Sequence, residues 1–352
     1  MLMIAAAMCG SAQAQQPAPD AQAQPAAAEK PRSPWLLVPM FSSSPKLGTA
    51  IGGLGAYMHM FDPNSRVSLF GASYRYTSTH SQIFSAFART SSGNDHHRII
   101  ALTAFGHIEN DYDDYLGTGQ PLKTSDELKA AAGRYLYRVK GDWFLGGQAT
   151  AANYQVLGST PEDDLALETL GVKGFASAGL GATVMHDSRD NEDMATKGWF
   201  LNVNNIAYLE SLGGSASFDA YRIDLRMFWN HGKGHVLAVR QYNWLTSDAP
   251  SAAQSTVTLR GYKQGQYLSP YTSSFEIEER VSFNPRWGAT LFAGTAKLYG
   301  EAPVPLDRTT YPMFGAGLHF VLKPVQRMNI NLEYAQGLED NRGVYLKLGY
   351  AW

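Results

Sequence analysis

The chain has 352 residues, of which 17% are charged and 12% are aromatic, with 34 glycines. Ordinary soluble domains carry roughly 25% charged residues, so this composition is low in charge and rich in aromatic side chains. Lysine and arginine number 29 against 31 aspartates and glutamates, and this near balance provides no basic footprint for a nucleic acid partner. Beyond the first few residues, no apolar run approaches the roughly 18 residues of a spanning helix, which excludes a helical membrane protein but not a β-barrel.

The amino-terminal residues have the pattern of an export leader. Met1–Met8 is a short apolar stretch, and the A-x-A sequence that ends at Ala14 predicts a signal peptide over residues 1–14. Residues 15–34 are rich in Gln, Ala and Pro and predict a disordered linker, because they cannot bury enough apolar surface to fold. Cys9 is the single cysteine and lies in the leader, so we expect neither a disulfide nor thiolate chemistry in the mature chain.

From residue 35 onward the dominant hydrophobic period is two, which is the period of a β-strand. In residues 221–229, for example, Tyr, Ile, Leu, Met and Trp alternate with Arg, Asp and Arg. Alternation fits a soluble sandwich as well as a membrane barrel. Tyr and Trp gather near the predicted strand ends, however, where the interfacial girdles of a membrane barrel lie. The aromatic residues therefore favour the barrel.

Turn signals divide the chain into strands. Short turns are predicted at residues 62–65, 91–94, 140–142, 231–234, 284–286 and 323–326, and longer connections near 110–126, 155–171, 210–218, 247–271 and 300–310. Brief periplasmic turns and long surface loops alternate in this way in outer-membrane barrels. We therefore predict an all-β fold, a closed transmembrane antiparallel β-barrel of about 16 strands over residues 35–352, in the bacterial outer membrane. Closure is required because lipid offers no hydrogen-bond partner to a free strand edge.

Polar residues on the face opposite the apolar side chains are expected to line the lumen. Their charges are of both signs, which predicts a hydrated interior. They are Arg134, Arg138, Asn202, Asn204, Arg222, Asp224, Arg226, Glu276, Glu278, Arg280, Asn329, Asn331, Glu333 and Lys347.

The connection between the predicted eleventh and twelfth strands contains the tetrad Leu259, Arg260, Gly261 and Tyr262. Here the chain resembles the bacterial surface antigen superfamily of BamA- and TamA-like barrels, in which a V/I-R-G-F/Y tetrad of the sixth surface loop folds back into the barrel. The resemblance implies that Arg260 pairs in the lumen, first with Glu278 and second with Glu276. Where the family usually has a further acid in a Phe-x-Asp-x-Gly motif, this chain has Phe292.

A second stretch, residues 187–198, resembles the family's D-[ST]-R-D-N…P-T-[KR]-G signature at a periplasmic turn, here with Ala195 in place of Pro. We place it between the sixth and seventh strands. Asp187, Arg189 and Asp190 are expected to bond one another and cap the turn, and Gly198 to supply a positive φ before the next strand. This role is structural rather than chemical. The two resemblances together cover about residues 174–352.

The carboxyl terminus resembles the sorting signal of outer-membrane barrels, because Tyr350 and Trp352 stand in phase with the lipid-facing residues. Trp replaces the usual terminal Phe. The expected partners are outer-membrane lipids and the barrel assembly machinery for insertion. Assembly and secretion members of the family carry periplasmic POTRA domains before the barrel. The chain therefore resembles a barrel-only branch, whose periplasmic partner is unknown.

Two functions stay open from the sequence. The resemblance implies translocation or insertion of protein or lipid at the outer membrane, with a weak seam between the first and last strands. The alternative is a passive solute channel with a charged wall. An enzyme is not expected, because no nucleophile stands with a base, and Glu276 and Glu278 suit lumen ion pairs better than acid/base catalysis. No cofactor is expected, nor a metal, because the histidines lack metal-ligand spacing.

Overall fold

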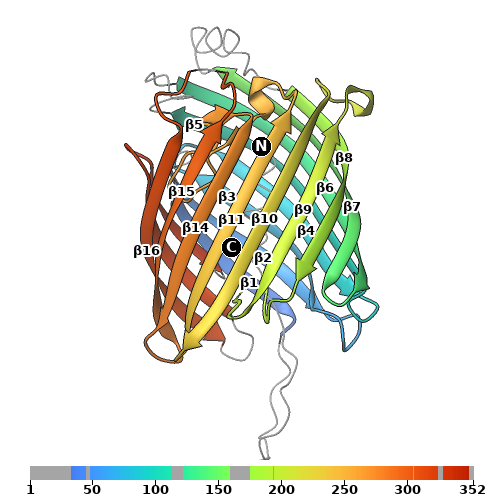
Figure 1. Ribbon diagram of the computed structural model, residues 1–352, viewed down its shortest axis with the longest axis vertical. Coiled ribbons are helices and arrows are strands. Elements are labelled where there is room, and N and C mark those ends of the chain that lie inside the picture. The colour runs from blue at the N-terminus through green and yellow to red at the C-terminus, as the bar shows by residue number, and fades with distance from the viewer. Residues whose placement is uncertain are drawn as a thin grey trace, which may run out of the picture.

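A computed structural model describes residues 33–352 except 45–47, 113–121, 159–174, 193, 304, 324–327 and 349–352. The predicted signal peptide, the linker up to residue 32, and Tyr350 and Trp352 lie outside the described residues. Within them, sixteen antiparallel strands form one closed barrel, in which β1 pairs with both β2 and β18 (Figure 1). The predicted closed barrel of about 16 strands is confirmed.

The strands follow one another around the wall in chain order. The barrel strands are β1 (Trp35–Ser44), β2 (Gly48–His59), β3 (Ser68–Thr77), β4 (Gln82–Ser92), β5 (His97–Tyr112), β6 (Leu122–Lys140), β7 (Trp143–Gly158), β8 (Phe175–Asp187), β9 (Gly198–Tyr208), β10 (Phe218–Gly232), β11 (His235–Ser247), β14 (Tyr271–Ser282), β15 (Trp287–Tyr299), β16 (Thr310–Lys323), β17 (Met328–Gln336) and β18 (Arg342–Leu348). Two short strands, β12 (Ser255–Thr256) and β13 (Leu268–Ser269), pair with each other inside the connection between β11 and β14.

The two ends of the barrel differ. The predicted turns at 62–65, 91–94, 140–142, 231–234 and 284–286 all fall at the end where β1 begins, which we call the short-turn end (lower end in Figure 1). The connection 248–270 is the sixth at the opposite end, the long-loop end. The tetrad therefore lies where the strand count predicts it.

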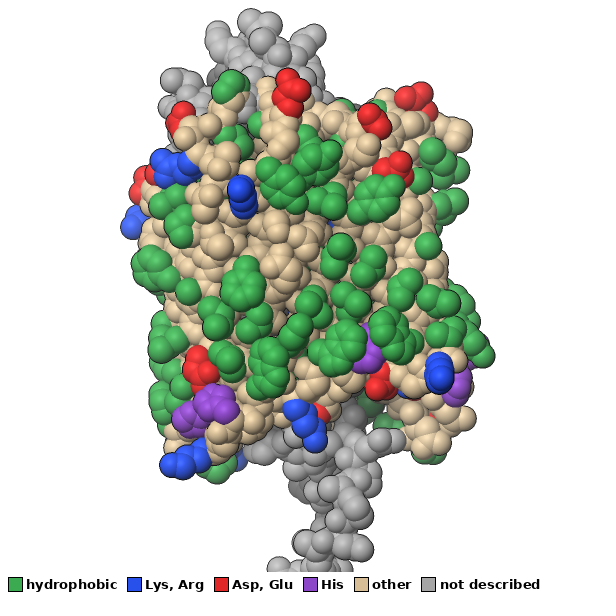
Figure 2. All heavy atoms as spheres, viewed as in Figure 1, with side chains coloured by type: hydrophobic (Ala, Val, Ile, Leu, Met, Phe, Trp, Pro, Cys, Tyr) green, Lys and Arg blue, Asp and Glu red, His purple; other side chains and the backbone are tan. Residues whose placement is uncertain are grey.

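Alternation along each strand separates two faces. On β14 the apolar side chains of Phe275 and Ile277 are about 40% exposed on the outer wall, while Glu276 and Glu278 are buried inside. Figure 2 shows hydrophobic side chains spread over the strands of the outer wall and charged side chains mostly near its two ends. The helical elements of the described chain are the single turns η1 (Glu210–Leu212) and η2 (Ser251–Ala253), and none there is long and apolar enough to cross a membrane.

One predicted position is wrong. The turn of the second motif joins β8 to β9, the eighth and ninth strands, rather than the sixth and seventh. The early strands are rich in Gly, Ala and Ser, as in β2 and β7, so their alternation is weak and the strand count before residue 187 comes out too low.

Candidate functional site

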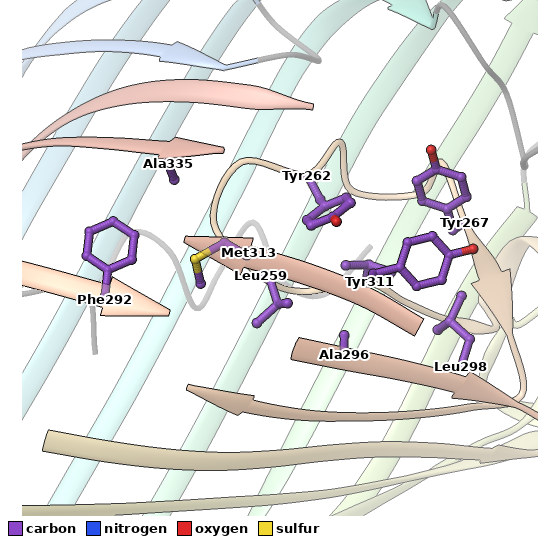
Figure 3. Close-up of a cluster of buried hydrophobic side chains, with 10 residues drawn as sticks. Leu259, Tyr262, Tyr267, Phe292, Ala296, Leu298, Tyr311, Met313 and Ala335 are labelled. Atoms are coloured by element: carbon purple, nitrogen blue, oxygen red, sulfur yellow. The ribbon is translucent and has the colours of Figure 1, made fainter. Parts of the chain in front are cut away.

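The connection from β11 to β14, which we call the lumen loop (residues 248–270), folds back against the inner wall. Its apolar side chains Val257, Leu259, Tyr262 and Tyr267 are each less than 5% exposed. They form one cluster with side chains of β15, β16 and β17 (Figure 3), namely Phe292, Ala296, Leu298, Tyr311, Met313 and Ala335. Since full burial of a large apolar side chain contributes roughly 1.5–3 kcal/mol, this cluster stabilises the loop in its folded-back position.

Polar contacts fix the loop to the last strands. The backbone N–H of Gly261 donates to Tyr345 Oη at 3.0 Å, and the N–H of Lys263 donates to Asn341 Oδ1 at 3.1 Å. Tyr262 Oη donates to the Pro312 carbonyl at 2.6 Å. Gly261 has φ of 90°, a conformation that L side chains rarely adopt, and an added Cβ would lie 3.3 Å from the Ala335 carbonyl oxygen. Glycine therefore allows the tetrad to lie flat on β17.

Arg260 is surrounded by acids. Its Nη1 lies 3.0 Å from Glu278 and 3.2 Å from Glu333, and its Nη2 lies 3.4 Å from Glu276. The Arg260 side chain is 8% exposed, and those of Glu278 and Glu333 are fully buried. Burial by itself lowers the pKa of Arg260, but the three carboxylates raise that pKa above its ordinary value, so the guanidinium stays charged.

Phe292 takes part in the same site. The guanidinium carbon of Arg260 lies 3.5 Å from the centroid of the Phe292 ring, a cation–π contact. The third acid comes instead from Glu333 on β17. Period-two alternation predicts that Glu333 lies on the lumen wall, but it does not predict that Arg260 is its partner. Which strands the loop contacts depends on the curvature of the barrel and not on the local sequence pattern.

The surrounding cations complete the charge balance. Arg280 Nε lies 2.8 Å from Glu278, Lys347 Nζ lies 3.4 Å from Glu333, and Arg240 Nη1 lies 3.6 Å from Glu276. Each buried acid thus has a second positive partner besides Arg260. An arrangement of alternating fixed charges can anchor a loop, since every buried charge is compensated.

The second motif forms the β8–β9 turn, of which the structure describes residues 188–192 and 194–197. Arg189 donates to Asp187 at 2.8 Å, and the Asp190 carboxylate accepts from the backbone N–H and the hydroxyl of Thr196 at 2.8 and 2.7 Å. Gly198 has φ of 94°, and an added Cβ would lie 2.3 Å from the Ser188 carbonyl oxygen. These contacts fix the shape of the turn.

Asp187 also joins a charge cluster that the sequence does not reveal. Arg66 of the β2–β3 turn and Arg98 of β5 lie 3.1 and 3.5 Å from Asp187. Asp95 of the β4–β5 turn is 2.6 Å from Arg98 and also pairs with Arg138. Burial alone would raise the pKa of Asp95, but hydrogen bonds and charge from its arginine neighbours lower it to about 2. No local signal predicts this cluster, because its members come from turns and strands far apart in sequence.

The remaining predicted lumen residues share the inner face with this site. Asp224 pairs with Arg226 at 2.5 Å and with Arg240 at 2.9 Å, and Gln148 donates to Asn204 at 3.0 Å. Asn202, Asn329 and Asn331 are buried. In the described part of the chain, no group of three or more His, Cys, Asp or Glu side chains is placed to hold a metal ion.

The sequence matches no protein-family model and no curated protein. Solved structures do match. BamA from Haemophilus ducreyi lacking POTRA domains 1–3 has a TM-score of 0.57 at 10% identity, over 91% of this chain and 70% of that chain. The chain has the barrel fold of BamA. CdiB from Escherichia coli has a TM-score of 0.63 at 12% identity, over 91% of this chain. CdiB from Acinetobacter baumannii has a TM-score of 0.60 at 10% identity, over 89% of this chain.

These likenesses confirm the expected resemblance to BamA-type barrels at the level of fold. The chain spans 63% of the Escherichia coli CdiB chain and 59% of the Acinetobacter baumannii one. The rest of each CdiB chain lies outside the region that matches this chain.

Proposed function

We propose that the protein is a bacterial outer-membrane barrel that moves or inserts polypeptide or lipid at that membrane by opening between β1 and β18. The proposed role is transport or insertion and not catalysis. Its fold likeness to BamA and CdiB and its lumen loop support this role, and the observation that carries it is Pro39 of β1, which faces β18 and has no N–H to donate across the β1–β18 seam. The periplasm would then lie at the short-turn end, and outer-membrane lipids would contact the outer wall.

The described part of the β1–β18 ladder is short, and the register sets the first residues of β1 opposite residues 349–352, which lie outside the described residues. β1 pairs with β18 over Phe41–Ser43 and residues 344–346, whereas it pairs with β2 from Trp35 to Ser44. Short ladders open at lower free energy, because fewer backbone hydrogen bonds must be exchanged for other partners.

Pro39 weakens the same seam. The Pro34 carbonyl accepts from the N–H of Met58 on β2, so even-numbered backbone groups of β1 face β2 and odd-numbered ones face β18. The nitrogen of Pro39 therefore faces β18, and the register that pairs Phe41 with Leu346 sets it opposite Leu348. Proline has no N–H to donate, and in sheets it is confined to the first residue, to bulges or to edges. β1 thus has the character of an edge strand.

A reversible cross-link tests the seam. Ser43 faces Val344 across β1–β18 and Thr49 across β1–β2, so Ser43→Cys can be paired with either Val344→Cys or Thr49→Cys. Opposed strand residues suit disulfide geometry. We expect the oxidised seam-locked variant to fail to complement a deletion strain, whose outer-membrane protein and lipid content should stay altered. Addition of reductant should restore complementation. The β1–β2 lock is the matched control and should complement fully. Full complementation by the oxidised seam-locked protein would refute the proposal.

The alternative function is a passive solute channel. The polar wall of β9, β10 and β11, where Asp224 pairs with Arg226 and Arg240, is the observation that supports it. Single-channel recording in planar bilayers separates the two functions. A large and steady conductance of the wild-type barrel supports the channel, and a mostly closed barrel supports the first proposal.

A further inference from the structure

The β8–β9 turn does not stay at the rim beside its own strands. Its residue Glu192 forms ion pairs with Arg66 of the β2–β3 turn, with Arg89 of β4 at 3.0 Å and with Arg98 of β5 at 3.7 Å. Three arginines from neighbouring elements on one side of the wall thus converge on one carboxylate. Arginine–carboxylate contacts of this kind are strong and directional where the side chains are shielded from water.

The other side of the turn contacts a different wall. Ala195 is 3% exposed and packs with Phe228 of β10 and with Val236 and Ala238 of β11. The Ala195 carbonyl accepts a hydrogen bond of 3.0 Å from Arg280 Nη1 on β14. The side chain of Arg280 is 3% exposed, so this contact lies inside the barrel.

The strand order shows how far these contacts are separated. Around the sixteen-strand barrel, β8 stands midway between β4 and β14, which are eight positions apart. Eight of sixteen positions is half of the circumference, so β4 and β14 face each other across the lumen. A single turn that touches inward side chains of both strands must cross the interior.

We propose that the β8–β9 turn is a lid across the lumen at the short-turn end, with Glu192 as the latch on one wall and Ala195 and Arg280 as the latch on the other. The small side chain of Ala195 packs in one buried cluster with Phe228, Val236 and Ala238. The lid limits the passage of ions and small solutes through the barrel. Its described contacts reach the β2–β3 turn, β4, β5, β10, β11 and β14, so the lid does not require the seam to open.

The test is the conductance of the purified full chain in planar bilayers. Glu192→Gln removes the charge of the latch and should raise the mean conductance at least several-fold over wild type. The matched control is Glu210→Gln, since Glu210 is exposed in η1 at the long-loop end and should leave conductance unchanged. Heat-modifiability on gels establishes that each variant is a folded barrel.

A second variant distinguishes loss of the Glu192 ion pairs from a folding defect of the barrel. Arg89→Cys with Glu192→Cys lacks the ion pair and should leak, and a bis-maleimide linker between the two thiols should return conductance to the wild-type level. Equal conductance of wild type, Glu192→Gln and the unlinked double variant would overturn the lid, and so would a leak that persists after linking. The seam experiment is read out by outer-membrane composition, so either proposal can fail while the other stands.

Discussion

At the residue scale, Arg260 brings one positive charge to three buried carboxylates. Arg260→Ala leaves Glu278 and Glu333 facing fewer cations in a water-poor site, and loss of one partner of a buried pair costs about 3–5 kcal/mol. We expect the variant to fold into a barrel with a lower temperature of heat modification and lower insertion efficiency. The exposed Arg342→Ala is the control and should behave as wild type. An unchanged transition temperature and unchanged surface levels of Arg260→Ala would contradict the anchoring role.

Asp95 gives the charge cluster at the short-turn end a defined pH dependence. Its pKa of about 2 in the folded protein lies below the ordinary value of a carboxyl group, about 4, so its ionised form stabilises the fold. This contribution is fully present above about pH 4 and is lost as the pH falls toward 2. Urea unfolding between pH 7 and pH 2 should show that decline in wild type, and a smaller decline in Asp95→Asn. Identical pH profiles for the two proteins would show that Asp95 does not cause the loss of stability at low pH.

At the element scale, the sequence predicts what is local. Period-two alternation places Glu276, Glu278 and Glu333 on the inner face, and turn residues mark the short-turn end. The partners across the lumen could not be predicted, because they depend on which strands curvature brings to face each other. The cluster of Arg66, Arg98 and Asp187 is one example, and the reach of Glu192 to β4 is another.

The first strand should exchange its backbone hydrogens unevenly. The N–H of Phe41 faces β18 beside the gap at Pro39, whereas the N–H of Met40 faces β2. We expect faster exchange at Phe41 than at Met40. Pro39→Ala supplies a donor opposite Leu348, worth about 0.5–1.5 kcal/mol, and should slow the exchange at Phe41. Pro34→Ala, whose nitrogen points toward β2, is the control, and equal exchange at Phe41 in wild type and Pro39→Ala would show that the proline does not weaken the seam.

At the scale of the whole molecule, Glu278 connects the lumen loop with the lid. It accepts from Arg260 at 3.0 Å and from Arg280 at 2.8 Å, and Arg280 in turn holds Ala195. Glu278→Gln should therefore lower the unfolding midpoint in urea and also raise conductance. Glu333→Gln should lower the midpoint alone, since the described ion pairs of Glu333 are with Arg260 and Lys347. A Glu278→Gln barrel as impermeable as wild type would argue against the connection.

The anchors of the β8–β9 turn are distributed over the β2–β3 turn, β4, β5, β10, β11 and β14, and none of them belongs to β1 or β18, which border the proposed opening. The wall can therefore part on one side while the central bore stays obstructed on the other. A cell that uses such a barrel could admit a large client sideways into the bilayer and still limit the exchange of small solutes between the two sides of the membrane.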